Sequence, residues 1–355
     1  MVRVRESRSV GTRGVRLLRW AAVGLGLGGW LVAAEHRGSQ FFGWEHLNAW
    51  RREGTGAGTE RVFVSPEFKS AFRWNELVLS WNAETPAGTG VKLEVRAIYP
   101  DRSTEYYPMG FWTTDRGTFG RTSATNRPDA DGEVRTDTLV LREPGVRAQV
   151  RLTLYAAERD RWPRMKFVGL SVLDTRAAPA LLPPERAAWG KTIDVPQRSQ
   201  VDYPEGVQGW CSPASVSMVL AYWAKVLGRP QLDRTVPAVA QGVFGPNWQG
   251  TGNWSFNTAF AGSFPGLRAY VTRLTDVSEL EEWIAEGIPV VVSVCYDRLR
   301  GRPPTRDGGH LVVCVGFTAA GDVIVNDPGT REGIRRTFPR GNLIKAWPTP
   351  TTPST

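Results

Sequence analysis

Hydrophobic and polar residues alternate along short segments between residues 61 and 176, and stretches rich in glycine, proline and aspartate separate these segments. Side chains of a β-strand point alternately to the two faces of a sheet, so this period of two predicts strands that are buried on one face. No stretch of this region has the length and period of a helix. Several short strands at this spacing predict an antiparallel β-sandwich domain. The clearest segments are residues 76–84, 91–100, 137–144, 147–156 and 165–174.

The pattern changes after a proline-rich stretch at residues 177–190, which predicts a linker. Residues 213–227 carry apolar side chains three and four positions apart, which predicts a helix. A second helix is expected at 277–286, ending at Gly287. Helices followed by an antiparallel sheet predict an α+β domain over residues 191–349, with a short tail at 350–355. Its strands are expected at residues 289–296, 311–317, 323–326 and 334–338.

The first 34 residues combine an arginine-rich start with an uncharged apolar run at 20–34 that ends in small side chains. This order is typical of a secretory signal peptide. The apolar run is shorter than the roughly 20 residues that span a bilayer, so an uncleaved membrane anchor is the second interpretation. We therefore expect an exported protein, secreted or at the cell surface, in which residues 35–60 form a polar spacer.

The net charge of +9 is unevenly distributed along the chain. The first 34 residues contribute +5, which leaves only +4 for the rest of the sequence. Such a small excess, without a run of basic residues, argues against a nucleic-acid partner. The sequence has no His/Cys pair at metal-ligand spacing and no acidic loop of the EF-hand type, so we expect no metal and no other cofactor.

The chain has three cysteines, and an odd number in an exported protein indicates at least one free thiol. Cys295 and Cys314 lie in predicted strands, where they are expected in the core or, if the strands are neighbours, in a disulfide. Cys211 directly precedes the first predicted helix, for which Ser212 is a good N-cap and Pro213 suits the first helical position. The free N–H groups of a helix start lower a thiol pKa, so Cys211 is a candidate nucleophile; a core cysteine is the alternative.

A cysteine nucleophile needs a base that afterwards protonates the leaving group, and His310 is the only histidine of the C-terminal region. It follows two glycines at the start of a predicted strand. Its second ring nitrogen needs an orienting partner, for which Asp327, at the end of the next strand, is the candidate. Alternation along this hairpin places both side chains diagonally on one face. The alternatives are a structural histidine and an aspartate that initiates a turn before Pro-Gly.

Four motifs together resemble the C39-like cysteine peptidases, which have a papain-like fold: Gln200, GWCSPAS at 209–215, GGH at 308–310 and NDPG at 326–329. The resemblance implies that Cys211 is the nucleophile, that His310 is the general base and acid, and that Asp327 orients it. It also implies that Gln200 donates to the oxyanion.

Two details of this resemblance stay open. Gln208 is closer to the cysteine in sequence and is an alternative oxyanion donor. Ser212 stands where the family usually has glycine, and its side chain either crowds the thiolate or improves the helix cap.

The resemblance implies an exported peptidase that hydrolyses peptide bonds of a peptide or protein substrate through a thioester acyl-enzyme. Two other functions remain open. One is a cell-surface binding module with an idle peptidase-like domain, which Ser212 would favour. The other is an amidase or acyltransferase on a non-peptide amide, which would use the same residues.

Tryptophans are candidate binding residues in both regions. The polar, glycine-rich stretch at 244–257 either lines a substrate cleft or is a surface loop pinned by its indoles. Arginines at 298–306 either rim that cleft or are solvated. In the predicted sandwich, four tryptophans either contact cell-wall glycan or form the core, which is the commoner role. The cleft candidates are Trp210, Trp248 and Trp254, and the four in the sandwich are Trp74, Trp81, Trp112 and Trp162.

Overall fold

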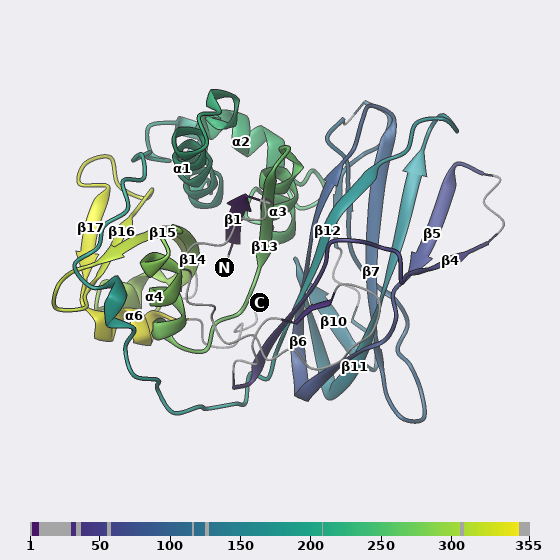
Figure 1. Cartoon of the computed structure of the whole chain (residues 1–355), viewed down its shortest axis with the longest axis horizontal. Helices are drawn as coiled ribbons and strands as arrows, with labels where there is room; N and C mark the ends of the chain where they lie inside the picture. Colours follow the sequence, from purple (N-terminus) through teal and green to yellow (C-terminus); the bar gives the residue numbers. More distant parts are fainter. Residues whose placement is uncertain are drawn as a thin grey trace, which may run out of the picture.

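The computed structural model describes residues 2–6, 30–32, 37–54, 58–115, 117–124, 128–207, 209–305 and 309–347. An all-β N-terminal region and a mixed C-terminal region lie side by side (Figure 1). Within the ranges described, no helix is long and apolar enough to cross a membrane. Most of the predicted signal segment, residues 1, 7–29 and 33–34, lies outside the described residues.

The N-terminal region is an antiparallel sheet of eleven strands rather than two separate sheets. Two long strands, β6 and β11, connect its parts, because β11 pairs with β6 along its first half and with β7 and β5 along its second. The register of β11 shifts on both sides of Gly145, and such irregularities bend a strand. The antiparallel character agrees with the sequence, whereas the two-layer sandwich stays a prediction, because the long strands connect all parts into one hydrogen-bonded sheet.

The order in this sheet is β2-β3-β12-β6-β11-β7-β8-β9, with β10 and β5 on β11 and β4 on β5. The strands are β2 (Trp30–Val32), β3 (Ser39–Trp44), β4 (Arg51–Glu53), β5 (Glu60–Val64), β6 (Phe68–Glu84), β7 (Thr89–Ile98), β8 (Tyr107–Trp112), β9 (Thr122–Ser123), β10 (Gly132–Arg135), β11 (Thr138–Ala156) and β12 (Arg164–Leu173). The expectation of a polar spacer at 35–60 is therefore wrong, since β3 is buried and pairs with β12.

Three of the four tryptophans that were candidates for glycan binding lie in the core of this region. Trp74, Trp81 and Trp112 are buried in one hydrophobic cluster. Trp162 is half-buried, and the Arg61 guanidinium lies 3.7 Å from the centre of its ring. A glycan platform built from these four side chains is excluded, because three of them have no exposed face.

The C-terminal region has a six-stranded antiparallel sheet in the order β13-β1-β14-β15-β16-β17. The strands are β1 (Val2–Glu6), β13 (Leu267–Val271), β14 (Val290–Cys295), β15 (Gly309–Phe317), β16 (Val323–Asn326) and β17 (Arg335–Phe338). The α-helices are α1 (Cys211–Val226), α2 (Val236–Val243), α3 (Trp254–Ser263), α4 (Val277–Ala285), α5 (Tyr296–Leu299) and α6 (Arg340–Ala346). Short 3₁₀ turns are η1 (Arg186–Ala188), η2 (Pro204–Gly206) and η3 (Pro230–Leu232). The four strands and two helices expected from the sequence are all present.

The start of α1 differs from the sequence-based expectation. Cys211 is the first helical residue, and Trp210 occupies the N-cap position. Ser212 is therefore inside the first turn and is not the cap, and its buried hydroxyl has no hydrogen-bond partner in the described structure. The helix packs on β15, where the Ser215 hydroxyl donates to the Leu311 carbonyl at 3.2 Å.

The predicted linker is attached to α4 rather than free. The backbone N–H of Leu182 donates to the Asp276 carboxylate, and that of Glu185 donates to the Glu281 carboxylate, both at 2.8 Å. The Trp189 indole donates to the same buried Glu281 at 2.8 Å. These bonds fix the path by which the chain passes from one region to the other.

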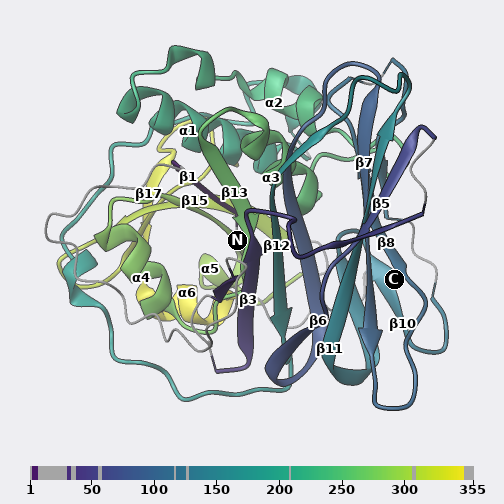
Figure 2. The ribbon, with the colours of Figure 1, turned by 45° about the vertical axis from the view of Figure 1, so that its right-hand side comes forward.

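The two regions share a core through α3, which lies against β6 in both views (Figures 1 and 2). Phe256 of α3 is fully buried, with its ring centre 5.4 Å from that of Trp112 and 6.3 Å from that of Trp81. Gly262 lets α3 approach closely, since a Cβ there would lie 2.1 Å from Asn82. Lys166 of β12 donates to the Gly262 carbonyl at the end of α3 at 2.7 Å.

Side chains of the N-terminal sheet also cover one edge of β13. The Asn82 amide exchanges two hydrogen bonds with the backbone of Ala269, at 2.7 and 3.0 Å, as a neighbouring strand would. Ser80 accepts from the N–H of Val271 at 3.3 Å. An unpaired strand edge is thereby satisfied by side chains of the other region, which holds β13 and the helix before it in place.

Candidate active site

Cys211 is half-buried at the first position of α1. Burial alone would raise its thiol pKa, but the hydrogen bond and charge of His310 lower the pKa below its ordinary value. Backbone N–H groups of Leu311 and Ser212 donate to the sulfur and act in the same direction. A helix start further stabilises a negative sulfur, so the surroundings of Cys211 favour a thiolate.

His310 lies in β15 and joins Cys211 to Asp327. Its Nε2 atom is 2.8 Å from Oδ1 of Asp327. Its hydrogen bond with Cys211 therefore falls to Nδ1, on the other side of the ring. Burial lowers the imidazole pKa, but the Asp327 carboxylate and the Cys211 sulfur outweigh it and raise that pKa to about 9. Both shifts favour a thiolate–imidazolium pair over a neutral thiol and imidazole.

The hairpin of β15 and β16 brings His310 and Asp327 together on one face, as expected, but not by regular alternation: the register shifts by one residue between Cys314 and Gly316. The pairing partners are Val313 with Asn326 and Cys314 with Val325, so the two side chains start from one end of the hairpin. Gly329 then folds over them: a Cβ at this position would lie 3.2 Å from both the imidazole and the Asp327 carboxylate. A side chain at this position would push the imidazole and the carboxylate away by a few tenths of an ångström, so glycine suits this close approach.

Asp327 is buried and accepts further hydrogen bonds that sequence reasoning missed. The Tyr296 hydroxyl donates to Oδ2 at 2.5 Å, Arg336 lies 3.2 Å from the same oxygen, and the N–H of Gly329 donates to Oδ1 at 3.0 Å. Burial would raise the pKa of Asp327, but the bonds from His310 and Tyr296 lower it. The Tyr296 ring also lies against the imidazole, with centroids 4.4 Å apart.

Gln200 connects the two sides of the site. Its backbone N–H donates to the Pro328 carbonyl at 2.9 Å, next to Asp327. Its side-chain amide donates to the carbonyls of Gly206 and Val207 at 3.1 and 3.2 Å, and its Oε1 atom is buried without a partner in the part of the chain described. Both amide hydrogens are thus held by the loop before Cys211, so donation to an oxyanion requires that one of these bonds be exchanged. Gln208 lies outside the described residues.

The other two cysteines are not joined in a disulfide. β14 and β15 are neighbours, but Cys314 pairs with Val290 and Cys295 pairs with Gly309, so the two residues lie at opposite ends of the strands. Five residues of strand correspond to about 17 Å, far beyond the Cα separation of a disulfide. Burial raises the pKa of the Cys314 thiol to about 12, which makes it unreactive.

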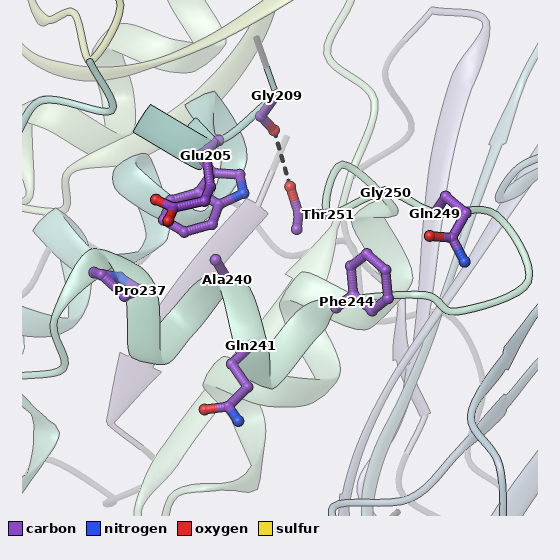
Figure 3. A pocket seen from close by; sticks show the side chains of 10 residues that line it. Glu205, Gly209, Pro237, Ala240, Gln241, Phe244, Gln249, Gly250 and Thr251 are labelled. Carbon is purple, nitrogen blue, oxygen red and sulfur yellow. Dashed lines mark hydrogen bonds between the residues drawn. The ribbon is translucent and has the colours of Figure 1, made fainter. Parts of the chain in front are cut away.

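The three tryptophans expected at a cleft have different positions. Trp210 lines a pocket of about 590 Å³ between the start of α1, helix α2 and the loop 244–251 (Figure 3). Trp248 is 41% exposed on that loop, where its ring covers Gly250. Trp254 is the first residue of α3 and packs against the core of the C-terminal region. The stretch 244–257 is thus a loop followed by a helix, which the sequence reading missed although Asn253 is a good N-cap.

Together these groups form a thiol, imidazole and carboxylate in series, the arrangement of a cysteine hydrolase. Among the residues described, no cluster of three or more His, Cys, Asp or Glu side chains is suited to a metal.

Both regions match models of known protein families. Residues 52–172 match the model of the Peptidase C39 N-terminal domain, and residues 192–353 match that of the Peptidase_C39 like family. The chain belongs to the C39-like peptidase family. A search of curated proteins gave no match.

The paired thiolate predicts a specific alkylation profile. We expect iodoacetamide to label Cys211 rapidly at pH 6, because the pair persists from the lowered pKa of Cys211 up to about 9, where His310 loses its proton. In His310→Ala only the backbone N–H groups and the helix start still oppose burial, so rapid labelling should require a pH near the ordinary thiol value of about 8.5. Mass spectrometry locates the adduct, and Cys314 is the internal unreactive control. Equal rates in both proteins at pH 6 would contradict the pairing.

Tyr296 is expected to be a positioning residue for Asp327. Tyr296→Phe keeps the ring against His310 but removes the bond to Oδ2, and a hydrogen bond to a charged group contributes about 1.5–3 kcal/mol. The carboxylate then protonates more readily, so the acid limb of the alkylation profile should move up by on the order of one pH unit.

Tyr222→Phe is the matched control. It removes one hydroxyl bond, to the Gly287 carbonyl at 2.8 Å, eleven residues further along α1 than Cys211. Thermal unfolding of both variants shows the general loss of stability. If the acid limb moves equally in both, Tyr296 has only a structural role.

Proposed function

We propose that this protein is a cysteine peptidase in which Cys211, His310 and Asp327 act as nucleophile, general base and acid, and orienting carboxylate, within a papain-like fold. The observation that carries the proposal is the hydrogen-bonded series from the Cys211 sulfur through both nitrogens of His310 to the buried Asp327. Membership in the C39-like peptidase family supports peptide-bond hydrolysis as the reaction.

In the first half-reaction the Cys211 thiolate attacks the carbonyl carbon of the scissile amide. The oxyanion is stabilised by the backbone N–H of Cys211, which as a first-turn N–H has no carbonyl partner within the helix. Gln200 donates to the same oxygen once one of its bonds to the loop 206–207 is exchanged. The His310 imidazolium then protonates the departing amine, and the carbon–nitrogen bond breaks to leave a thioester on Cys211.

In the second half-reaction His310, now neutral, removes a proton from water, and the oxygen of that water attacks the thioester. Collapse of the second tetrahedral intermediate breaks the carbon–sulfur bond, releases the carboxylic acid and restores the thiolate–imidazolium pair. Asp327 keeps the imidazole oriented in both steps, and Tyr296 and Arg336 hold Asp327. Ser212 lies inside the first turn of α1 and is buried, which is compatible with an accessible sulfur.

Hydrolysis is tested with a mixed peptide library at pH 5–10. We expect cleavage by the wild type, loss of more than about 10³-fold in Cys211→Ala and His310→Ala, and a loss of about 10²–10³ in Gln200→Ala. Cleavage should fall above pH 9, where His310 no longer supplies the proton, whereas iodoacetamide labelling should persist because the thiolate remains. Hydroxylamine should trap the thioester as a peptidyl hydroxamate.

Two outcomes separate the alternatives. A wild type that labels rapidly at pH 6 but cleaves no peptide and forms no hydroxamate would contradict peptidase activity, and a non-peptide amide substrate would be tested next. Slow labelling together with no cleavage would favour the idle binding module.

We also propose that residues 1–34 direct export. The arginine-rich start and apolar run of the sequence support this. Strand β1 belongs to this segment and pairs with β13, so cleavage after Ala34 would remove one strand of the C-terminal sheet.

Expression of the full chain in a secreting bacterial host, followed by mass spectrometry of the N-terminus, tests the export signal. We expect an exported protein that begins at Glu35, and we expect Leu25→Arg to prevent export because a charge interrupts the apolar run. An intact N-terminus in the membrane fraction would favour the anchor. An intact, cytoplasmic wild-type protein would contradict export.

A further inference from the structure

The pocket beside Cys211 has the size of a side-chain binding site. Its volume is about 590 Å³, within the range of ligand pockets. Trp210, which directly precedes the proposed nucleophile, forms one wall, and α2 and the loop 244–251 form the others (Figure 3). The Thr251 hydroxyl donates to the Gly209 carbonyl at 2.8 Å and so joins that loop to the segment before Cys211. The pocket is therefore lined by the two residues that directly precede the proposed nucleophile.

The lining is apolar inside and polar at the rim. Trp210, Phe244 and Ala240 supply aromatic and aliphatic surface. Glu205 and Gln241 are exposed at the rim. An acidic side chain would be repelled by Glu205 and would find no cation among the lining residues, whereas an aromatic ring would contact two other rings.

The N-terminal region holds the outer wall of the pocket. The buried Arg121 guanidinium lies 4.1 Å from the centre of the Trp112 ring and donates to the Gly242 carbonyl, at the end of α2, at 2.6 Å. Asn247, in the loop, accepts from the backbone N–H of Ser123 at 2.9 Å and donates to its carbonyl at 3.0 Å. The position of the loop is thus determined by β9 of the other region.

We propose that this pocket binds a bulky apolar side chain, preferably aromatic, of the peptide substrate beside the scissile bond, and that the N-terminal region sets its selectivity by holding the loop wall. This inference rests on the proposed peptidase function. It assigns the accessory region a part in substrate selection rather than in glycan binding.

The test uses dipeptidyl acyloxymethyl ketones, which alkylate a catalytic thiolate, with phenylalanine or alanine at either position. We expect the wild type to react at least tenfold faster with phenylalanine than with alanine at one position. Ala240→Phe fills the pocket, so this ratio should fall to about one. Ala238→Phe adds the same ring to the same helix at a position that does not line the pocket, and it should keep the wild-type ratio.

Two further variants test the walls. Phe244→Ala removes one aromatic wall of the pocket without adding a bulky side chain. It therefore serves as the test if Ala240→Phe does not fold. Asn247→Ala removes both bonds to Ser123 and should lower the phenylalanine-to-alanine ratio severalfold, whereas a purely structural role would lower thermal stability and leave the ratio unchanged.

Iodoacetamide separates failure of the pocket from failure of the proposed function. If His310-dependent labelling at pH 6 is intact but the wild type reacts equally with both probes, or with neither, the pocket assignment is wrong and the thiolate assignment stands. If Ala240→Phe folds and keeps the wild-type ratio, the assignment is also wrong. Loss of His310-dependent labelling in the wild type would instead contradict the proposed function itself.

Discussion

The carboxylate of Asp327 is buried, and a buried charge is tolerated only where hydrogen bonds and opposite charge replace water. Strand β15 supplies His310, α5 supplies Tyr296, β17 supplies Arg336, and the turn after β16 supplies the Gly329 N–H. These donors come from separate elements, so the sheet must have its observed strand order for the carboxylate to be satisfied. The orientation of His310, and through it the state of the Cys211 thiol, follows from this one buried charge.

A second constraint is the edge of β13. Backbone groups on that edge have no strand beside them, and polar side chains of the N-terminal sheet replace one, with Asn82 exchanging two bonds with Ala269. The helix before β13 contributes Phe256 to the core of the N-terminal sheet. The two regions are therefore joined by a shared core and by backbone pairing, which is a stronger connection than the linker alone. Because α3 follows directly on the loop 244–253, the same connection determines where the outer wall of the pocket lies.

The sequence predicted the features that depend on residues close together along the chain. The hairpin of β15 and β16 was predicted, as was the common face of His310 and Asp327, but that common face depends on a register shift between Cys314 and Gly316 that the sequence did not reveal. The helix that begins at Cys211 was also predictable, although its N-cap is Trp210, two residues before the expected Ser212. Tyr296 and Arg336 were not predictable, because their approach to Asp327 depends on how α5 and β17 fold around the hairpin. The spacer was wrong, and the continuity of the N-terminal sheet was not foreseen, for a related reason: β3 and the long strands are defined by partners far away in sequence.

Helices α2 and α3 were not predicted, although the sequence contains a capping residue at the start of each. Each begins with a capping side chain, Thr235 or Asn253, that accepts from a backbone N–H in the first turn. Glycines concealed the helical period of both helices, and each lies at a close approach: a Cβ at Gly242 would lie 2.3 Å from Phe260. Gly262 is small because Asn82 lies against it.

The loop between Gln200 and Cys211 contacts the proposed oxyanion donor and also contributes to the pocket. Gly206 packs between the Gln200 carbonyl and the Trp210 ring, where a Cβ would lie 2.6 and 2.9 Å from them. The same loop holds both amide hydrogens of Gln200 and carries the tryptophan that lines the pocket. The proposed oxyanion donor and the pocket wall are therefore parts of one short segment. A change in the position of Trp210 would alter the carbonyls that Gln200 binds, so substrate contact and the release of an oxyanion donor share one structural element.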